Sequence, residues 1–366
     1  NEYLPVKLLN GDFSAAPSVA LERGCGVRSN GEVRCWGGTF ALPPYAHEAI
    51  AGIGGLALTV HNGGSHQCVL RDDAKVLCWG ANDYGSLGDG TTQSHQSPAP
   101  LAGMTQVVTQ LSVGVNHGCA LLADASVACW GWNFAGQAGG EDLQPGPVTG
   151  LADAAYISAG FWSSCAVTAS GAVWCWGSNA HGVLGEDIVG TSAVPVQIEG
   201  LPAAALTVSV GNRHACALLV DGHIACWGSG SSGQLGQGQT ESSSTPVLVA
   251  SAESFVQVVA GYNFSCARSS ANEVFCWGSP GSGALGLGPD NRNQLVSVPQ
   301  ALGRTAMHLA ATPNLPAACA LDAQGDAWCW GNNDNAQLGI GRRGVREAPG
   351  PVMGMGEDVF FDGFEP

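Results

Sequence analysis

Short apolar runs separated by glycine-rich polar loops recur along the whole chain. The run VVTQLSV, from Val107 to Val113, is typical, and a glycine and a short polar loop follow it. No apolar period of 3.6 residues is sustained, so the runs predict β-strands rather than helices. In most copies an Asn- and Gly-rich loop, a Gly-x-Leu-Gly signature and a Pro-containing strand such as PVQIEGL, Pro195 to Leu201, complete the pattern. The pattern predicts four strands in each copy.

Seven cysteine pairs mark these copies. Nine residues separate the two cysteines of a pair, Trp-Gly follows the second, and the pairs recur every 43 to 53 residues. Such a period indicates one array of repeated units rather than two or three independent domains. Four-stranded antiparallel units that close on themselves form a propeller, so the sequence predicts an all-β, seven-bladed β-propeller. The pairs use every cysteine: Cys25 and Cys35, Cys68 and Cys78, Cys119 and Cys129, Cys165 and Cys175, Cys216 and Cys226, Cys266 and Cys276, and Cys319 and Cys329.

The spacing within each pair predicts one disulfide inside each blade. In SGAVWC, Ser170 to Cys175, and DGHIAC, Asp221 to Cys226, a Ser-Gly or Asp-Gly lies midway between the cysteines, as expected for a tight hairpin. Cysteines opposite each other at a non-hydrogen-bonded pair have Cα atoms about 4.5 Å apart, which a disulfide can span. Free buried thiols are the alternative, and zinc is disfavoured because no Cys-x2–4-Cys motif occurs. Paired cysteines predict a secreted or extracellular protein.

The stretch CALLVDGHIACWGSGSSGQLGQG, Cys216 to Gly238, resembles the RCC1 (regulator of chromosome condensation) repeat family of seven-bladed β-propellers. The matching features are the Gly-x-x-His-x-Cys-Ala-Leu segment at Gly211 to Leu218, the Asp-Gly turn, Trp-Gly and Gly-x-Leu-Gly. The likeness covers about residues 17–355 and leaves 1–16 and 356–366 as terminal segments. Members of the family include a nuclear nucleotide-exchange factor that binds chromatin, and secreted bacterial proteins. One type of these bacterial proteins inhibits β-lactamases through one propeller face. Because the paired cysteines predict secretion, we interpret the chain as similar to the secreted bacterial RCC1-like propellers.

Charge and composition narrow the range of partners. The formal net charge is −16, with only 13 Lys and Arg residues, so we expect no nucleic-acid partner because the phosphate backbone would be repelled. No apolar run reaches 18 residues, which predicts no membrane span. No basic and apolar signal segment opens the chain at Asn1, so we expect the numbered sequence to be the processed form of an exported protein.

No motif for catalysis or cofactor binding occurs. The chain lacks His-Glu-x-x-His, Gly-x-Ser-x-Gly and phosphate-loop patterns, and its loop carboxylates lack the spacing of a calcium loop. His66, His117 and His214 lie two residues before a first cysteine, but different blades would hold them apart, so we expect structural histidines rather than a metal site. We expect no enzyme, no cofactor and no metal. The alternative to this expectation is an enzyme whose site is assembled from residues scattered along the sequence.

The loop before each first cysteine varies from copy to copy, and equivalent loops of a propeller meet at one mouth of its channel. Clustered aromatic residues with an arginine are typical of an interaction hot spot. Packing between blades is the alternative for these rings, and it is what we expect for the seven Trp of the Cys-Trp-Gly motif. Trp132 and Phe134 are further candidates for exposure. The predicted partner-binding residues are Phe161, Trp162, Arg213, Tyr262 and Phe264.

The two ends of the chain and the first copy depart from the repeat. The first copy has GGTFALPPYAHEAIAG, Gly37 to Gly52, where Gly-x-Leu-Gly belongs, so blade 1 is expected to be abbreviated. One terminal strand commonly completes the last blade, which would leave the other apolar end without a sheet unless it pairs with another chain. The predicted self-association residues are Tyr3, Leu4, Val6, Leu8, Val359, Phe360, Phe361 and Phe364.

Two functions follow from these features. The first is a non-enzymatic extracellular structural or adhesive propeller that associates with itself through a terminal strand. Head-to-tail pairing of that kind does not close and would give filaments. The alternative is a monomeric secreted binding or inhibitor protein that captures a protein or glycan on the aromatic loop face.

Overall fold

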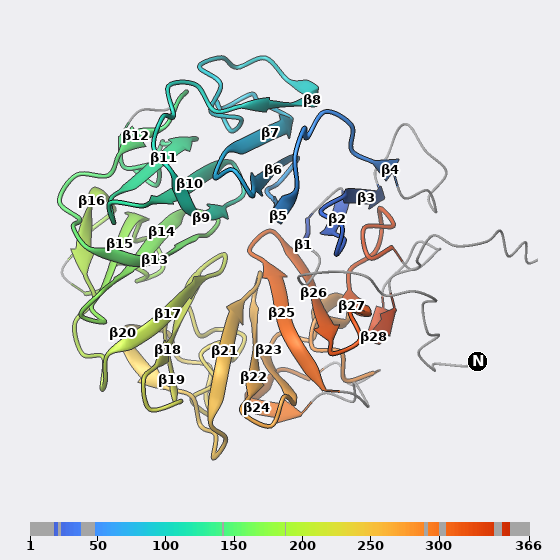
Figure 1. The fold of residues 1–366 in the computed structure, drawn as a ribbon. Coiled ribbons are helices and arrows are strands. Elements are labelled where there is room, and N and C mark those ends of the chain that lie inside the picture. The colour runs from blue at the N-terminus through green and yellow to red at the C-terminus, as the bar shows by residue number, and fades with distance from the viewer. Residues whose placement is uncertain are drawn as a thin grey trace, which may run out of the picture.

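The computed structural model describes residues 18–20, 23–37, 48–140, 143–186, 188–288, 292–299, 305–339 and 346–351. These residues form seven antiparallel sheets, each built from four strands that follow one another in the sequence. Figure 1 shows the sheets as blades around a central axis, with the last blade beside the first. The predicted all-β, seven-bladed propeller is confirmed.

The strands have the following bounds. The first three blades consist of β1 (Ser18–Val19), β2 (Arg23–Val27), β3 (Val33–Gly37) and β4 (Glu48–Ala49); β5 (Ala57–Asn62), β6 (His66–Arg71), β7 (Val76–Gly80) and β8 (His95–Pro100); and β9 (Val108–Val113), β10 (His117–Leu122), β11 (Val127–Gly131) and β12 (Gly146–Pro147). Blades 4 and 5 consist of β13 (Ala154–Ala159), β14 (Ser163–Thr168), β15 (Val173–Ser178) and β16 (Thr191–Gln197); and β17 (Ala205–Val210), β18 (His214–Leu219), β19 (Ile224–Gly228) and β20 (Ser243–Leu248). Blades 6 and 7 consist of β21 (Phe255–Ala260), β22 (Phe264–Ser269), β23 (Val274–Gly278) and β24 (Gln294–Pro299), with the 3-10 turn η1 (Gly281–Gly283); and β25 (Ala306–Thr312), β26 (Leu315–Asp322), β27 (Ala327–Gly331) and β28 (Arg346–Pro351).

The two ends of the propeller carry different connections. The first strand of each blade is innermost, and neighbouring first strands such as β13 and β17 contact each other around the axis. At one end the second strand begins and the third ends, as where Ser163 pairs with Gly177. We call this end the loop face, because it carries the variable loops and the Gly-x-Leu-Gly loops. The opposite end, which carries the hairpins between second and third strands, is the hairpin face.

All 14 cysteines are paired as predicted, one disulfide in each blade. The two cysteines of a pair lie directly opposite each other on the second and third strands, as Cys165 and Cys175 do. Their Cα atoms are 4.0 to 4.1 Å apart in every blade. Each bridge therefore cross-links the centre of its sheet. In order of blades, the bridges join Cys25 to Cys35, Cys68 to Cys78, Cys119 to Cys129, Cys165 to Cys175, Cys216 to Cys226, Cys266 to Cys276 and Cys319 to Cys329.

The hairpin between the two cysteines of a pair is as tight as predicted. It turns through a left-handed residue, which is Gly171 in blade 4 and Gly222 in blade 5, each with φ of 83°. The Ser-Gly and Asp-Gly turns of the sequence thus supply the glycine where the backbone requires a positive φ.

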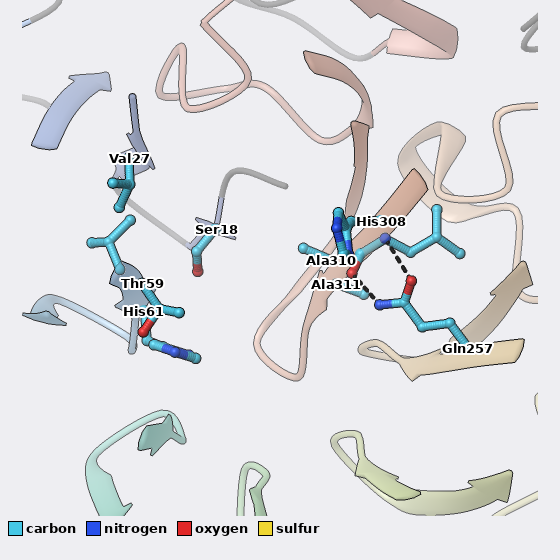
Figure 2. A pocket seen from close by; sticks show the side chains of 10 residues that line it. Ser18, Val27, Thr59, His61, Gln257, His308, Ala310 and Ala311 are labelled. Atoms are coloured by element: carbon cyan, nitrogen blue, oxygen red, sulfur yellow. Dashed lines mark hydrogen bonds between the residues drawn. The ribbon is translucent and has the colours of Figure 1, made fainter. Parts of the chain in front are cut away.

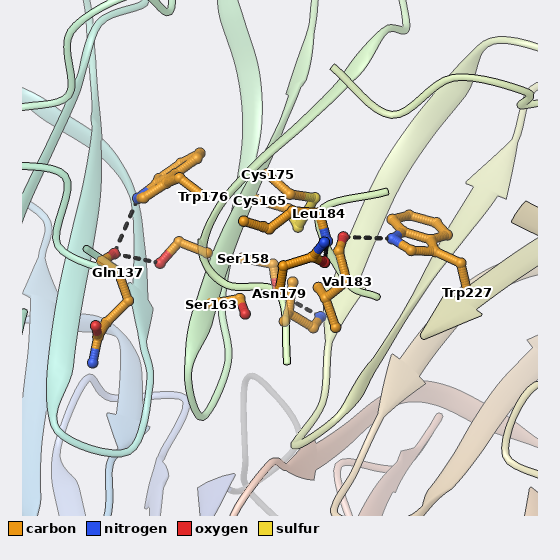
Figure 3. The surroundings of a disulfide bond; sticks show 12 residues. Gln137, Ser158, Ser163, Cys165, Cys175, Trp176, Asn179, Val183, Leu184 and Trp227 are labelled. Carbon is orange, nitrogen blue, oxygen red and sulfur yellow. Dashed lines mark hydrogen bonds between the residues drawn. A yellow bond between two sulfur atoms is a disulfide. The ribbon is translucent and has the colours of Figure 1, made fainter. Parts of the chain in front are cut away.

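The tryptophan after each second cysteine lies buried between blades, as predicted. Within the described residues of every blade except blade 2, its indole N–H donates to a carbonyl of the loop that carries the Gly-x-Leu-Gly signature in the preceding blade. Trp176 Nε1 lies 3.0 Å from Gln137 O, and Trp227 Nε1 lies 2.8 Å from Val183 O. Figure 3 shows these two bonds on either side of the blade 4 disulfide. One residue type thus supplies both apolar area and a directed bond at each such junction.

The same contact closes the ring between the last blade and the first. Trp36 Nε1 donates to Gln337 O at 2.8 Å, across 301 residues of sequence. Val19 packs with Trp36, Leu315 and Leu338 in one buried cluster. Among the described residues, the four strands of blade 7 follow one another in the sequence. Residues 1–16 and 356–366 lie outside the described residues, so the completion of the last blade by one of the terminal segments stays a prediction. The predicted self-association residues, Tyr3, Leu4, Val6, Leu8, Val359, Phe360, Phe361 and Phe364, lie outside the described residues.

Blade 1 is abbreviated within the part of the chain that the structure describes. Its outer strand β4 has only two residues, which pair with Arg34 and Cys35. Within the same part of the chain, the buried Trp79 Nε1 of blade 2 has no hydrogen-bond acceptor. At the other junctions a carbonyl of the loop that follows the third strand is the acceptor, and residues 38–47 of the corresponding loop in the first copy lie outside the described residues. The two-residue outer strand β12 of blade 3 was not expected from the sequence.

Candidate partner-binding surface

Four aromatic side chains from three neighbouring blades meet on the loop face. The ring centroids of Tyr84 and Trp132 lie 5.4 Å apart, those of Trp132 and Trp162 lie 4.8 Å apart, and those of Phe161 and Trp162 lie 4.9 Å apart. Tyr84 is 51% exposed, and the other three rings are partly exposed. We call these four residues the aromatic cluster. It brings together two predicted site residues, Phe161 and Trp162, and one further candidate, Trp132.

The loops that carry the aromatic cluster are held by backbone bonds and by buried asparagine side chains. Phe161 N donates to Gly211 O of the next blade at 3.2 Å, and Trp132 N donates to Asn116 O at 2.8 Å. In the loop of Tyr84, the buried Asn82 accepts from Leu87 N at 2.9 Å through its side-chain oxygen. A surface held in this way loses little conformational entropy when a partner binds.

Basic and small polar residues continue this surface toward blade 5. Arg213 is exposed on the loop between β17 and β18, and the described residues include no acid paired with it. His181 lies near it, and both burial and the charge of Arg213 lower the pKa of His181. A shallow groove of about 290 Å³ follows, lined by His181, Gly182, Ser229 and Ser244, among others. Rings, a cation and a polar groove therefore lie along one face.

Two predicted partner-binding residues lie elsewhere in this geometry. Tyr262 is partly exposed in the equivalent loop of blade 6 and is not one of the rings that form the aromatic cluster. Phe264 is fully buried, so its assignment to the binding surface was wrong. It begins β22, and its ring packs in the interior with Ala318 and Trp330 of the next blade.

Two further aromatic residues, Phe134 and Tyr84, are exposed on the loop face. Phe134 is 86% exposed, as its place outside the repeat pattern suggested. Tyr84 was missed because its loop was not compared between copies, although an aromatic residue before Gly-x-Leu-Gly is visible in the sequence. Comparison of both loops would have found the whole aromatic cluster.

The three histidines two residues before a first cysteine are buried parts of the blade junctions. His117 Nε2 lies 2.9 Å from Ser164 Oγ and His214 Nε2 lies 2.8 Å from Ser265 Oγ, and each serine belongs to the next blade. Glycine takes the place of the serine beside His66, whose Nε2 has no partner among the described residues. Burial lowers the pKa of His66 to about 4 and those of His117 and His214 to about 3. Their expected structural function is thereby supported, and they stay in separate blades.

The central channel contains a second hollow of about 230 Å³ near blade 1. Figure 2 shows Thr59 and His61 on one side of it and His308 and Gln257 on the other. Gln257 Nε2 donates to Leu309 O at 2.9 Å, and Leu309 N donates back to Gln257 Oε1 at 2.9 Å. Burial lowers the pKa of His61 to about 4. The side chains of the innermost strands thus tie neighbouring blades together around the axis.

Within the described ranges, no group of three or more His, Cys, Asp or Glu side chains is placed to hold a metal ion. The same ranges contain no helix with the length and apolar character of a membrane span.

These observations define a disulfide-bridged, seven-bladed repeat propeller. Two sequence models, both described as "Regulator of chromosome condensation (RCC1) repeat", match the chain. One matches residues 73–121, 170–218 and 221–268, and the other matches 108–137, 155–183, 206–234 and 255–284. The chain therefore belongs to the RCC1 repeat family.

Known relatives share this repeat in proteins of different kinds. The chain is 26% identical over 342 residues to the mouse E3 ubiquitin-protein ligase HERC2, covering 90% of this chain and 6% of that protein. It is 28% identical over 210 residues to the ultraviolet-B receptor UVR8 of Arabidopsis thaliana, covering 55% of this chain and 48% of that protein. The chain thus spans less than half the length of either relative.

Solved structures show the same fold. Human WBSCR16 superposes with a TM-score of 0.77 at 20% identity, covering 86% of each chain. Prp20p of Saccharomyces cerevisiae superposes with a TM-score of 0.71 at 19% identity, covering 81% of this chain and 80% of that chain. The same yeast protein, at a TM-score of 0.72, 18% identity and coverage of 81% and 78%, has also been solved with Kap60 bound to it.

Proposed function

We propose that this chain is a secreted, non-enzymatic binding propeller that captures a partner on the aromatic cluster. The observation that carries the proposal is the contact of Tyr84, Trp132, Trp162 and Phe161 across three blades. A disulfide in every blade supports an oxidising, extracellular setting. The complex of yeast Prp20 with Kap60 supports protein capture as a use of this fold. A bacterial origin stays a prediction of the sequence.

The geometry of the rings favours a protein partner over a glycan. Neighbouring rings are inclined by 27° to 54° and pack on one another, so they form one compact apolar patch rather than separate flat platforms for sugar rings. Trp, Tyr and Arg dominate the binding energy of protein interfaces, and Arg213 lies on the same face without an acid partner among the described residues. The expected partner surface therefore combines an apolar side chain with a carboxylate.

The test compares two variants of the intact, disulfide-bonded protein. Chemical cross-linking in the native extracellular fraction, followed by mass spectrometry, identifies the partner, whose affinity is then measured with purified proteins. Trp132→Ala with Trp162→Ala should weaken binding at least 100-fold, since a hot-spot residue contributes about 2 kcal/mol or more. Phe134→Ala is the matched control, because that ring is exposed outside the aromatic cluster, and it should bind as the unchanged protein does. Capture that survives the double substitution would contradict the proposal.

A second candidate function is self-association through a terminal segment, which head-to-tail pairing would extend into filaments or a structural, adhesive layer. The observation in its favour is that the described strands close the ring through Trp36 and Gln337, with four strands already present in each of the seven blades. Light scattering and electron microscopy of the whole chain should then show assemblies that disappear when residues 1–16 or 356–366 are removed. Monomers at high concentration in the whole chain would overturn this candidate without affecting the first.

A further inference from the structure

Every innermost strand of blades 2 to 7 contains a β-bulge at its second residue. In β17 Ala205 pairs with Leu219 and Thr207 pairs with Leu218, which leaves Leu206 as the extra residue. Val256 in β21 and Met307 in β25 are extra in the same way. A bulge redirects one side chain out of the regular alternation. In blades 5, 6 and 7 it turns an apolar side chain to solvent where the strand begins, at the hairpin face.

Three consecutive blades place large apolar side chains at this position. Leu206 is 53% exposed, Val256 is 43% exposed and Met307 is 39% exposed. Val220, also exposed, adjoins them, because its backbone N–H donates to Ala204 O at 2.9 Å, two residues before Leu206. We call these four exposed residues, Leu206, Val220, Val256 and Met307, the bulge patch. It lies by the channel mouth, on the opposite face from the aromatic cluster.

The hairpins place carboxylates beside the bulge patch. Phe255 N donates to Gly222 O at 2.8 Å, which brings the hairpin of Asp221 next to Val256. Ala306 N donates to Asn272 O at 2.9 Å, which brings the hairpin of Glu273 next to Met307. Glu253 lies in the loop that leads into β21. The one arginine nearby among the described residues, Arg268, is partly buried and donates to Asn272 Oδ1.

Acidic residues dominate the rest of the hairpin face as well. Its other cations, among the described residues, are Arg28, Arg34, Arg71 and Lys75. The first two pair with Glu32 and the other two pair with Asp73. Asp72, Asp124 and Asp153 are exposed on the same face. This distribution repels nucleic acids, anionic lipid surfaces and the same face of a second copy. An apolar patch with an anionic rim is complementary to a cationic and apolar partner.

We propose that the bulge patch and its carboxylates are a second docking surface, which takes a lysine- or arginine-rich apolar segment of a partner protein. This surface is separate from the aromatic cluster. An experiment that disproves this proposal therefore leaves the proposed function untouched, and the reverse also holds. The apolar side chains supply the contact area, and Asp221, Glu253 and Glu273 select the sign of the charge. Binding weakens as salt is added, because exposed charges are screened.

The experiment uses fluorescence anisotropy of the whole chain with three labelled peptides of equal length and alternating composition. One peptide contains Lys and Leu, one contains Lys and Ser, and one contains Glu and Leu. The Lys/Leu peptide should bind at least ten-fold more tightly than either of the others. Leu206→Ser with Val256→Ser should weaken its binding at least ten-fold, and Glu253→Gln with Glu273→Gln should weaken it several-fold and reduce its salt dependence.

Two controls isolate the surface. Val189→Ser removes an apolar side chain that is 98% exposed on the connection between β15 and β16, and it should leave binding unchanged. The Trp132→Ala, Trp162→Ala variant should also bind the peptide normally. Equal binding of the Lys/Ser and Lys/Leu peptides would show general charge attraction and overturn the proposal. Unchanged binding after the bulge-patch substitutions would do the same, and Val220→Ser with Met307→Ser gives an independent variant if the first pair fails to fold.

Discussion

At the scale of single residues, the hairpin turns differ between blades in how easily their backbone is adopted. Gly171 and Gly222 have φ of 83° at the turn between the cysteines. Ala74 and Ala125 take the same place with φ of 63° and 64°. A left-handed conformation costs a residue with a Cβ atom about 1–2 kcal/mol, so the alanine turns are strained where the glycine turns are not.

Replacing Ala125 by glycine should therefore raise the free energy of unfolding by about 1 kcal/mol, after allowance for the greater freedom of glycine in the unfolded chain. The measurement is the urea midpoint under non-reducing conditions, at an unchanged slope. The matched control is Gly222→Ala, which should lower the midpoint because its φ is positive and its Cβ would press on Ser254 Oγ. A lower midpoint for Ala125→Gly would contradict the assigned strain.

The candidate site was predictable only in part at this scale. Phe161 and Trp162 were found because their loop varies between copies and gathers aromatic residues. Phe264 was misplaced because a loop compared by sequence does not show which way a side chain points. Its position two residues before the cysteine is the one that His117 and His214 occupy, and these were expected to be structural residues. The same assignment should have been extended to Phe264, whose ring fills the equivalent buried place.

At the scale of elements, the second and third strands of each blade were the easiest to predict. The cysteine pair and the turn between them fix the register of these strands, as Cys216 opposite Cys226 shows. The outer strands follow no such marker, and β4 and β12 shrink to two residues. The bulges in the innermost strands were not predictable, because an extra residue such as Leu206 looks like one more member of an apolar run. The bulge patch therefore follows from the register between the first and second strands of each blade, which the apolar pattern of the sequence does not show.

At the scale of the whole molecule, seven repeated copies were enough to predict the propeller but not the way it closes. Closure depends on Trp36 and Gln337, which lie 301 residues apart and belong to ordinary copies of the motif. The contact between the two residues can be seen only in the folded structure, because nothing in the sequence links them. Three of the junctions also share one liability, because each buries a histidine: His66, His117 or His214. His117 and His214 lie buried at two of the junctions, and both have lowered pKa values.

The stability of the ring should depend on pH through these buried histidines. Their folded-state pKa values of about 3 lie below the ordinary value of 6.5, so the unfolded chain binds protons in this interval that the folded chain does not. Their contribution to the free energy of unfolding is fully present above about pH 6.5, and it is lost as the pH falls toward 3. The free energy of unfolding, measured by urea titration from pH 7 to pH 4, should therefore decline steadily, by on the order of several kcal/mol in total.

Replacing His214 by phenylalanine tests how much this one histidine contributes to the loss of stability at low pH. Phenylalanine fits the position, because Phe264 occupies the equivalent buried place in blade 6. The variant should lose less stability than the unchanged protein between pH 7 and pH 4, since it removes a group that the unfolded chain protonates. Ser265→Ala is the control. It removes the hydroxyl that lies 2.8 Å from His214 Nε2 and should lower stability by about 1 kcal/mol, by a similar amount across the range. If His214→Phe shows the same slope against pH as the unchanged protein, then proton binding to this histidine does not link pH to the stability of the ring.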